Sequence, residues 1–488
     1  MSAQQSEVAV VGAGAAGLYT ALHVARAGVP VTLISAGPLA GASSYWAQGG
    51  LAAALADDDS PDRHLADTIA AGRGSVRESA ARVLCDEAPG AVQDLTDLGV
   101  TFDADRTGRL ALGLEGGHSA RRIVHAGGAA TGRRIIRQLS ALAAEEERIA
   151  VLEGRRATQI LTAGGRAVAV ALDDGTVIAA RAIVLATGGA AALWQRTTNP
   201  PGAIGAGLLL AHAAGAQLAD LELMQFHPTV VSGGNGSRLP DGFLVTEAVR
   251  GEGARLLNAA GERFVNELAP RDEVARAVQR QIDSSGGAPV GLDMRDVDPA
   301  LFPNVVSALR KAGIDPEREL VPVAPAAHYM MGGVATDLNG RASLAGLYAV
   351  GECSCTGLHG ANRLASNSLS ECFVFGARAA LAALEEPEMT EAPEAFDTPA
   401  GATAAFAISA ESRAALWRDA GLERDGQGLL RLAQDPHPLV RLIAAGALAR
   451  QESRGAHQRL DFPDRSAHLD GRHVTITAGA QPTLETWS

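Results

Sequence analysis

Cysteine, lysine and net positive charge are all scarce in this chain of 488 residues. Lys311 is the sole lysine, which we attribute to a codon bias. The formal net charge of −13 opposes non-specific binding to nucleic acid or to anionic membranes. Four cysteines are too few and too irregularly spaced for a disulfide framework or for paired zinc motifs, and no metal site is expected. They are Cys85, Cys353, Cys355 and Cys372.

Signals for export or for crossing a membrane are also missing. The N-terminal residues lack the basic flank and apolar segment of a secretory signal. Residues 199–219 carry no charge and approach the length of a membrane span, about 20 residues. They include the Pro200–Pro201 pair, His212 and Gln217, so we predict a buried helix of a soluble, cytoplasmic protein instead.

The first motif is a glycine turn between a short apolar segment and a helical pattern. Residues 7–11 favour a strand, residues 15–26 favour a helix, and residues 31–34 favour a second strand. In this context G-x-G-x-x-G indicates a dinucleotide site, because the turn lets a pyrophosphate approach the helix N-terminus. The residues expected to line that site are Gly12, Gly14, Ala15, Ala16 and Gly17.

Two later segments extend the same fold. Residues 182–189 and 346–352 are apolar strands that end in glycine turns, and they suit one parallel sheet with the first two strands. The intervening residues 221–328 are richer in charge and indicate an inserted domain. Residues 385–403 favour a linker, residues 404–461 have helical spacing, and residues 466–488 show little pattern and are expected to be mobile.

Several motifs together carry a family resemblance. They are residues 43–50 (SSYWAQGG), 114–119 (LEGGHS), 246–253 (TEAVRGEG), 269–272 (APRD), 327–329 (AHY), 358–369 (LHGANRLASNSL) and 452–463 (ESRGAHQRLDFP). From residue 7 to about residue 463, the chain resembles the flavoprotein subunits of fumarate reductase and succinate dehydrogenase. Within that family it is most similar to the branch that oxidises L-aspartate.

The resemblance implies an α/β fold in three parts. We expect a Rossmann-like FAD-binding domain from residues 1–220 and 329–388. An inserted α+β capping domain spans residues 221–328, and a C-terminal helical domain spans residues 404–488.

The resemblance also implies FAD as the cofactor. Glu352 is expected to bind the ribityl hydroxyls, and the start of the helix at residues 367–369 to stabilise charge at flavin N1 and O2, although residues 366–368 could instead be a plain helix cap. Ser35 stands where many flavoproteins have an acidic ribose ligand. Ser43 stands where respiratory members attach FAD through histidine, so FAD should be non-covalent. The remaining cofactor-binding candidates are Ser44, Gln48, Gly49, Gly50, Gly188, Asn367, Ser368 and Leu369.

A four-carbon dicarboxylate needs cations and donors for its two ends. Arg363 offers a bidentate fork, and the resemblance places His227 and His328 as further donors, with a structural histidine as the alternative for each. Arg271 matches the family arginine that protonates fumarate; it would be re-protonated through Glu247 or Arg250, or else act as an electrostatic clamp. The short polar partners are Gln225, Thr246 and Ser366, whereas Arg276 is expected to be structural.

Glu115 is the residue expected to distinguish aspartate from succinate. Respiratory members have an apolar or amide residue at this place, and a carboxylate there would repel succinate but pair with the ammonium group of aspartate. The alternative is a surface glutamate in a glycine loop, with His118 and Ser119 fixing that loop.

The implied reaction is hydride transfer from L-aspartate to FAD. It gives iminoaspartate for quinolinate and NAD synthesis, with a functional link to quinolinate synthase. Dioxygen or fumarate would reoxidise the flavin. A soluble fumarate reductase, a respiratory subunit and a non-catalytic FAD-binding module are the alternatives.

Overall fold

The computed structural model describes residues 4–232, 242–389, 393, 395–397 and 407–488. Its centre is a parallel sheet in the order β18-β11-β2-β3-β7. The five strands are β2 (Val8–Val11), β3 (Val31–Ser35), β7 (Ile149–Glu153), β11 (Ala182–Leu185) and β18 (Leu347–Ala349). The predicted parallel sheet is confirmed, and β7 is a strand that the sequence analysis did not anticipate.

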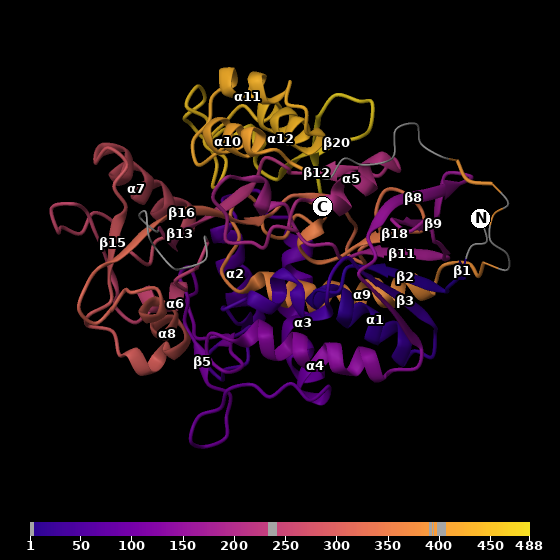
Figure 1. Cartoon of the computed structure of the whole chain (residues 1–488), viewed down its shortest axis with the longest axis horizontal. Coiled ribbons are helices and arrows are strands. Elements are labelled where there is room, and N and C mark those ends of the chain that lie inside the picture. Colours follow the sequence, from indigo (N-terminus) through magenta and orange to yellow (C-terminus); the bar gives the residue numbers. More distant parts are fainter. Residues whose placement is uncertain (1–3, 233–241, 390–392, 394, 398–406) are drawn as a thin grey trace.

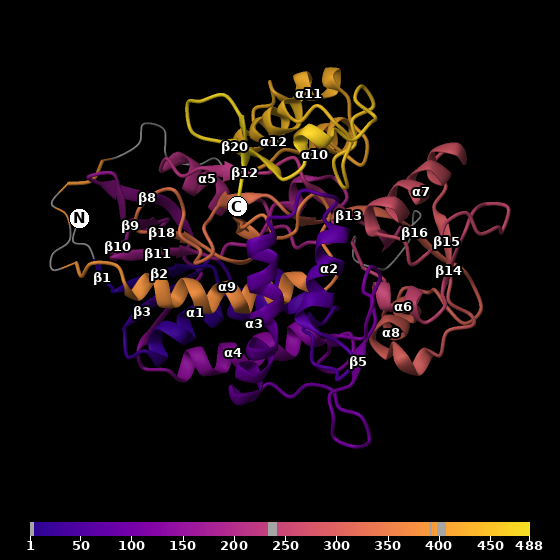
Figure 2. The ribbon, with the colours of Figure 1, turned by 180° about the vertical axis from the view of Figure 1, so that it is seen from behind.

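Alternating side chains of this sheet enter two separate cores. Val8 and Val10 face a layer of helices, whereas Ala9 and Val11 face a second sheet. The helical layer, seen below the strands in Figure 2, comprises α1 (Ala15–Arg26), α3 (Glu78–Asp97), α4 (Thr131–Glu145) and α9 (Asn367–Leu384). The second sheet has the order β1-β10-β9-β8 and is formed by β1 (Gln4–Gln5), β8 (Ala157–Ala163), β9 (Arg166–Leu172) and β10 (Val177–Ala179).

An inserted unit lies beside the part built on the parallel sheet (Figure 1). Its antiparallel sheet has the order β13-β16-β15-β14, and residues such as Leu256, Val274 and Val323 form a core of their own. The strands are β13 (Met224–Val231), β14 (Arg255–Leu257), β15 (Val290–Asp293) and β16 (Val321–Met330). The helices are α6 (Glu247–Gly251), α7 (Arg271–Ser284) and α8 (Pro303–Lys311).

The C-terminal part lies at the top of the view in Figure 1, above α5 (Ala206–Ala213). It contains α10 (Ala410–Asp419), α11 (Gly426–Leu432) and α12 (Pro438–Ala449), followed by a hairpin of β20 (Arg472–Ile476) and β21 (Thr483–Thr486). That hairpin completes a sheet in the order β19-β17-β12-β20-β21, with β12 (Leu218–Ala219), β17 (Gly333–Ala335) and β19 (Ser354–Cys355). The expectation of a patternless, mobile tail was therefore wrong, because pairing with residues far away in the chain orders it.

The single helix predicted across residues 199–219 was also wrong in extent. Only α5 (Ala206–Ala213) is helical, because the Pro200–Pro201 pair and the left-handed Gly205 precede it and β12 follows. Among the described residues, no helix combines the length and apolar character that a bilayer crossing requires. Much of the predicted linker at residues 385–403 lies outside the described residues.

The remaining short elements surround the centre of the molecule. They are α2 (Pro61–Ala71), β4 (Leu51–Ala52), β5 (Leu112–Gly113) and β6 (Ile123–Val124), with the three strands paired in the order β4-β6-β5. This small sheet holds the loop of residues 114–119 against the start of α9, since Ala52 N donates to Ser366 O over 3.2 Å. The loop and the start of α9 thus meet where the inserted unit reaches the part built on the parallel sheet.

Candidate active site

The glycine turn after β2 has the shape of a phosphate cradle. Gly12 has φ +112°, and a Cβ there would collide with the carbonyl of Ala186, while a Cβ at Gly17 would collide with the carbonyl of Gly12. Gly14 differs, because a Cβ there would meet only Ser44 Oγ at 3.4 Å and Ala42 Cβ at 3.8 Å. Packing within the protein therefore does not explain Gly14, whereas the close approach of a pyrophosphate to the start of α1 does.

A buried polar group without a partner lies in the same region. Ser44 Oγ accepts a hydrogen bond from Ala15 N over 3.2 Å at the start of α1. Gln48 Oε1 is buried with no hydrogen-bond partner among the described residues. Because such a group is costly to leave unpaired, it fits a polar ligand bound beside the residue 43–50 loop. The turn after β11 also borders the glycine turn, since a Cβ at Gly12 would meet Ala186, and Gly188 in that turn has φ +75°.

Several other predicted cofactor residues have defined places. Ser43 and Ser44 open a short 3-10 helix (Ser43–Trp46), and Ser35 ends β3 with its hydroxyl donating to Gly37 O over 2.6 Å. Gly49 lies beside Ser366 and Glu115, whereas a Cβ at Gly50 would collide with Val124, so Gly50 is required by packing on β6.

Glu352 follows β18 and packs against Gly189, and its Oε1 accepts a hydrogen bond from Met330 N over 3.0 Å. Burial raises the pKa of Glu352 to about 7. A carboxyl group at this depth suits hydrogen bonds to neutral hydroxyl groups, as a ribityl chain offers.

The start of α9 presents backbone rather than side-chain groups. Asn367 uses its side chain within the protein, since Oδ1 contacts His64 Nε2 at 2.8 Å and Nδ2 donates to Thr68 Oγ1 over 3.1 Å. Ser368 Oγ is hydrogen-bonded by Arg363, and Leu369 is buried. The helix has neither a side-chain cap nor an acidic residue in its first turn, so its N-terminal dipole remains available to an electron-rich ring. The residues present therefore fit FAD, and the plain-cap alternative for residues 366–368 loses its main support.

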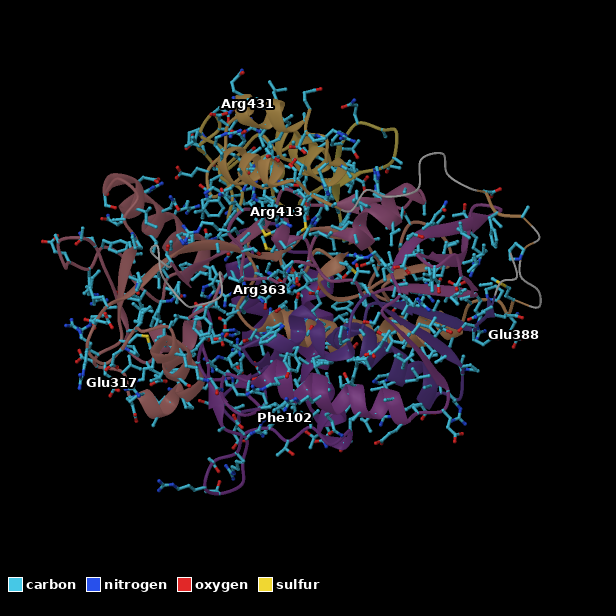
Figure 3. All side chains as sticks on the ribbon, viewed as in Figure 1. Phe102, Glu317, Arg363, Glu388, Arg413 and Arg431 are labelled. Carbon is cyan, nitrogen blue, oxygen red and sulfur yellow. The ribbon has the colours of Figure 1, made fainter. Side chains whose placement is uncertain are left out.

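Two buried arginines converge on one glutamine. One of them, Arg363, is labelled near the centre of the molecule in Figure 3. Arg363 Nε donates to Gln225 Oε1 over 3.2 Å, and Arg271 Nη1 donates to the same oxygen over 3.3 Å. Gln225 is itself held by Asn362 Oδ1 and by Arg363 O. The guanidinium of Arg363 stacks 4.6 Å from the ring centre of Tyr329, and burial lowers the pKa of Arg363 to about 10.

Two histidines border these arginines. His227 and His328 have ring centres 5.3 Å apart, and His328 Nδ1 contacts Thr198 Oγ1 at 2.7 Å. His227 Nε2 is buried without a hydrogen-bond partner among the described residues. Burial, reinforced by Arg271, lowers the pKa of both imidazoles well below the ordinary value, so both are neutral near pH 7. A neutral imidazole with one free nitrogen suits a donor to a ligand carboxylate.

Arg271 begins a chain of alternating charges. Its Nε donates to Glu247 Oε2 over 2.6 Å, and Glu247 Oε1 lies 3.4 Å from Arg250 Nη2. Arg271 and Arg250 lower the pKa of Glu247 against the opposing effect of burial, which is the largest single influence. Thr246 precedes Glu247 as the N-cap of α6 and is also buried. Both predicted proton partners of Arg271 are therefore its neighbours in space.

Glu115 enters the cluster from the loop after β5. It is 5% exposed, which excludes a surface glutamate, and it accepts a hydrogen bond from Ser366 Oγ over 2.7 Å. Within the described part of the chain Glu115 has no ion pair within 4.0 Å. Its negative charge nevertheless acts to raise the pKa of Arg363 and of Arg250. A buried carboxylate with only one hydroxyl partner has capacity for a further donor.

Sequence reasoning missed several neighbours of these residues. Tyr329 supports Arg363, and Glu371 accepts from Tyr329 OH over 2.8 Å. Arg122 is fully buried and binds Asp59, and neither residue stood out locally. Tyr329 lies in the AHY motif and could have been found there. Arg276 contacts Gly455 O and Asp272, which suits the structural role expected for it.

Known proteins resemble this chain over nearly its whole length. Residues 7–369 match the family model of an FAD binding domain, and residues 433–486 match that of the fumarate reductase flavoprotein C-terminal region. Among solved structures, a quinol fumarate reductase from E. coli superposes with a TM-score of 0.88 at 28% identity, covering 99% of this chain and 96% of that one. A quinol-fumarate reductase with menaquinol gives 0.89 at 29% identity, covering 100% and 98%. The chain is thus an FAD-binding flavoprotein of the succinate dehydrogenase and fumarate reductase family.

Closer relatives narrow the assignment. An L-aspartate oxidase from Caulobacter vibrioides is 46% identical, covering 97% of this chain and 98% of its own length. A second from Mesorhizobium japonicum is 46% identical, covering 98% and 96%, and a third from Streptomyces coelicolor is 39% identical, covering 98% and 92%. The chain belongs to the L-aspartate oxidase family.

Proposed function

We propose that the protein oxidises L-aspartate to iminoaspartate with non-covalently bound FAD. The observation that carries the proposal is Glu115, a buried carboxylate beside the arginines that suit the substrate carboxylates. Its charge acts on Arg363 and on Arg250, but it forms no ion pair within 4.0 Å among the described residues. The ammonium group of aspartate would supply the missing partner. Succinate has no such group and would leave Glu115 unpaired.

The chain's own residues supply binding and orientation. Arg363 and Arg271 bind the two carboxylates of the substrate, with His227 and His328 donating hydrogen bonds, and Glu115 accepts from the ammonium group. Arg363 and Arg271 both donate to Gln225 Oε1, and these hydrogen bonds orient the two guanidinium groups before the substrate binds. When bound, FAD supplies the acceptor for the hydride that leaves the substrate Cα. The ammonium group must also give up one proton as the C=N bond forms, and Glu115, its hydrogen-bond acceptor, takes that proton in the proposal. Burial of the cluster excludes water from the reacting atoms.

Proton movement is assigned to Arg271, Glu247 and Arg250. An arginine is a poor acid alone, because its pKa exceeds about 12. Glu247 lies 2.6 Å from Arg271 and is ionised, so it can pass a proton to Arg271 only as it takes one from Arg250, 3.4 Å away. The three residues therefore act as one relay in the proposal. This arrangement supports fumarate as one electron acceptor, since its reduction consumes a proton at carbon. Dioxygen is the second acceptor in the proposal.

The product defines the metabolic setting. Iminoaspartate hydrolyses readily in water, so the reaction that consumes it must follow closely. We place the protein in the cytoplasm, in the supply of quinolinate for NAD synthesis, with a functional link to quinolinate synthase. The second candidate function, a soluble fumarate reductase, is favoured by the Arg271–Glu247 pair alone and leaves Glu115 without a role.

Anaerobic mixing tests the proposal directly. The holoenzyme is mixed with L-aspartate in one experiment and with succinate in another, while the flavin absorbance is followed. Rapid bleaching by aspartate and slow or absent bleaching by succinate is expected. Bleaching by succinate alone would establish the fumarate reductase alternative, and no bleaching by either would refute oxidation of these substrates.

A further inference from the structure

Ser366 has an unusual backbone conformation at the start of α9. Its φ is +62°, and the other described non-glycine residues with positive φ are Arg73 and Asp220. Side chains with a Cβ rarely adopt this left-handed region, so the surroundings must impose it. Since Ser366 Oγ is the hydrogen-bond donor to Glu115, whatever imposes the conformation also sets the position of that carboxylate.

His118 is one residue that imposes it. His118 Nε2 lies 2.9 Å from the carbonyl oxygen of Ala365, which directly precedes Ser366. Arg122 Nη1 lies 3.2 Å from His118 Nδ1. A guanidinium can only donate, so Nδ1 must accept and the proton must be on Nε2. The imidazole therefore donates to Ala365 O in one defined tautomer.

The support for His118 is rigid. Arg122 is fully buried, and it donates to both carboxylate oxygens of Asp59 over 2.8 Å and to Asp67 over 2.5 Å. Burial lowers the pKa of His118 to about 4, so the ring stays neutral and keeps its tautomer near pH 7. The ring can neither gain a second proton nor turn without breaking the contact with Arg122.

Glu115 and His118 belong to the same loop, in which His118 N donates to Glu115 O over 3.2 Å. The loop is thus joined to residues 365–366 at two points, through Glu115 Oε2 and through His118 Nε2. We propose that His118 is a positioning residue for substrate selection, which holds Ser366 so that its hydroxyl aims the Glu115 carboxylate at the substrate ammonium. This inference rests on the proposed oxidation of aspartate.

Three variants test it by a ratio of two activities. The ratio is kcat/KM for aspartate oxidation divided by kcat/KM for fumarate reduction, with bound flavin measured in each preparation. His118→Leu removes the donor, and the ratio should fall about fivefold to thirtyfold, as expected for one lost hydrogen bond that positions a charge. His118→Gln retains a donor near Nε2 and should restore most of the ratio. His212→Leu, in α5, is the control for loss of a histidine and should leave the ratio unchanged.

A double-mutant cycle separates positioning from general damage. In a Glu115→Gln background, His118→Leu should lower the ratio no further, because the charge that it positions is gone. Ser366→Ala, which keeps the Cβ but removes the hydroxyl, should repeat the selective loss if His118→Leu fails to retain flavin. Equal losses of both activities in His118→Leu, or in Ser366→Ala, overturn this inference and leave the proposed function standing. A wild-type enzyme without aspartate oxidation overturns both.

Discussion

Glu115→Gln separates recognition of an ammonium group from recognition of two carboxylates. The substitution keeps the size of the side chain and an oxygen that can accept from Ser366 Oγ, now 2.7 Å from Glu115. It removes one negative charge from a 5% exposed position. A hydrogen bond to a charged group contributes about 1.5–3 kcal/mol. We therefore expect kcat/KM for aspartate oxidation to fall about tenfold to a hundredfold.

Fumarate reduction should respond in the opposite direction. The substitution removes a negative charge that repels the carboxylates of fumarate, and fumarate has no ammonium group that would lose a partner. The rate of fumarate reduction should therefore be retained or rise, and succinate should become a better reductant of the flavin. Steady-state kinetics with both substrates, on enzyme with equal flavin content, measure this.

The opposed response is the diagnostic result. Equal losses for aspartate and fumarate would mean that the substitution disturbed the loop of residues 114–119 as a whole. No loss for either would show that Glu115 does not contact the substrate and would remove the observation on which the proposed function depends.

Four further outcomes follow from the same geometry. Because Ser43 stands where a linking histidine would be, acid precipitation should leave free FAD in the supernatant; yellow colour retained by the pellet would contradict this. Arg363→Leu should lower kcat/KM by about a hundredfold or more for both aspartate and fumarate while FAD stays bound, and near-normal kinetics would place Arg363 away from the substrate. Glu247→Gln should lower kcat for fumarate reduction by about a hundredfold, because a neutral amide cannot pass a proton to Arg271; an unchanged kcat would exclude the relay. Burial lowers the pKa of His64 and of His118 from 6.5 to about 4, so the unfolded state binds more protons in that interval and stability must fall as pH drops from 6.5 to 4. Each histidine accounts for a loss of up to about 3 kcal/mol of unfolding free energy over that pH interval. Melting curves of His118→Gln should therefore show a weaker dependence of Tm on pH.

The part of the fold that the sequence predicted is the part with local signals. Strands β2, β11 and β18 are wholly or almost wholly apolar, β3 has three apolar residues in five, and all four are buried along their length. Strand β7, at the sheet edge, has a single buried residue, Ile149, so its membership of the sheet depends on pairing with β3. Strand β20 pairs with β12, some 250 residues earlier in the chain, and nothing local in either segment specifies that partner.

The candidate site shows the same division. Glu115, Arg271 and Arg363 lie in the motifs that carry the family resemblance, whereas Gln225 lies outside them. The structure brings these four residues together from four separate segments. Their supporting groups could not be predicted, because an isolated Arg122 in the sequence looks like an ordinary surface charge. Complete burial is possible only through carboxylates contributed by other elements, and such long-range pairing is not encoded in local spacing.

The order of strands in the two sheets governs when the molecule can assemble during synthesis. Strand β11 pairs with β2 and also with β18, which ends at residue 349. Strand β12 pairs with β20, which ends at residue 476, so that pair forms only after nearly the whole chain has been made. At a synthesis rate of about 5–20 residues per second, β2 precedes its distant neighbour β18 by roughly 20 to 70 s. During that time the glycine turn has no completed sheet behind it, and the start of α9 has not yet been made. Flavin capture is therefore a late event in the life of the nascent chain, and ribosome-bound fragments that stop before α9 should remain colourless.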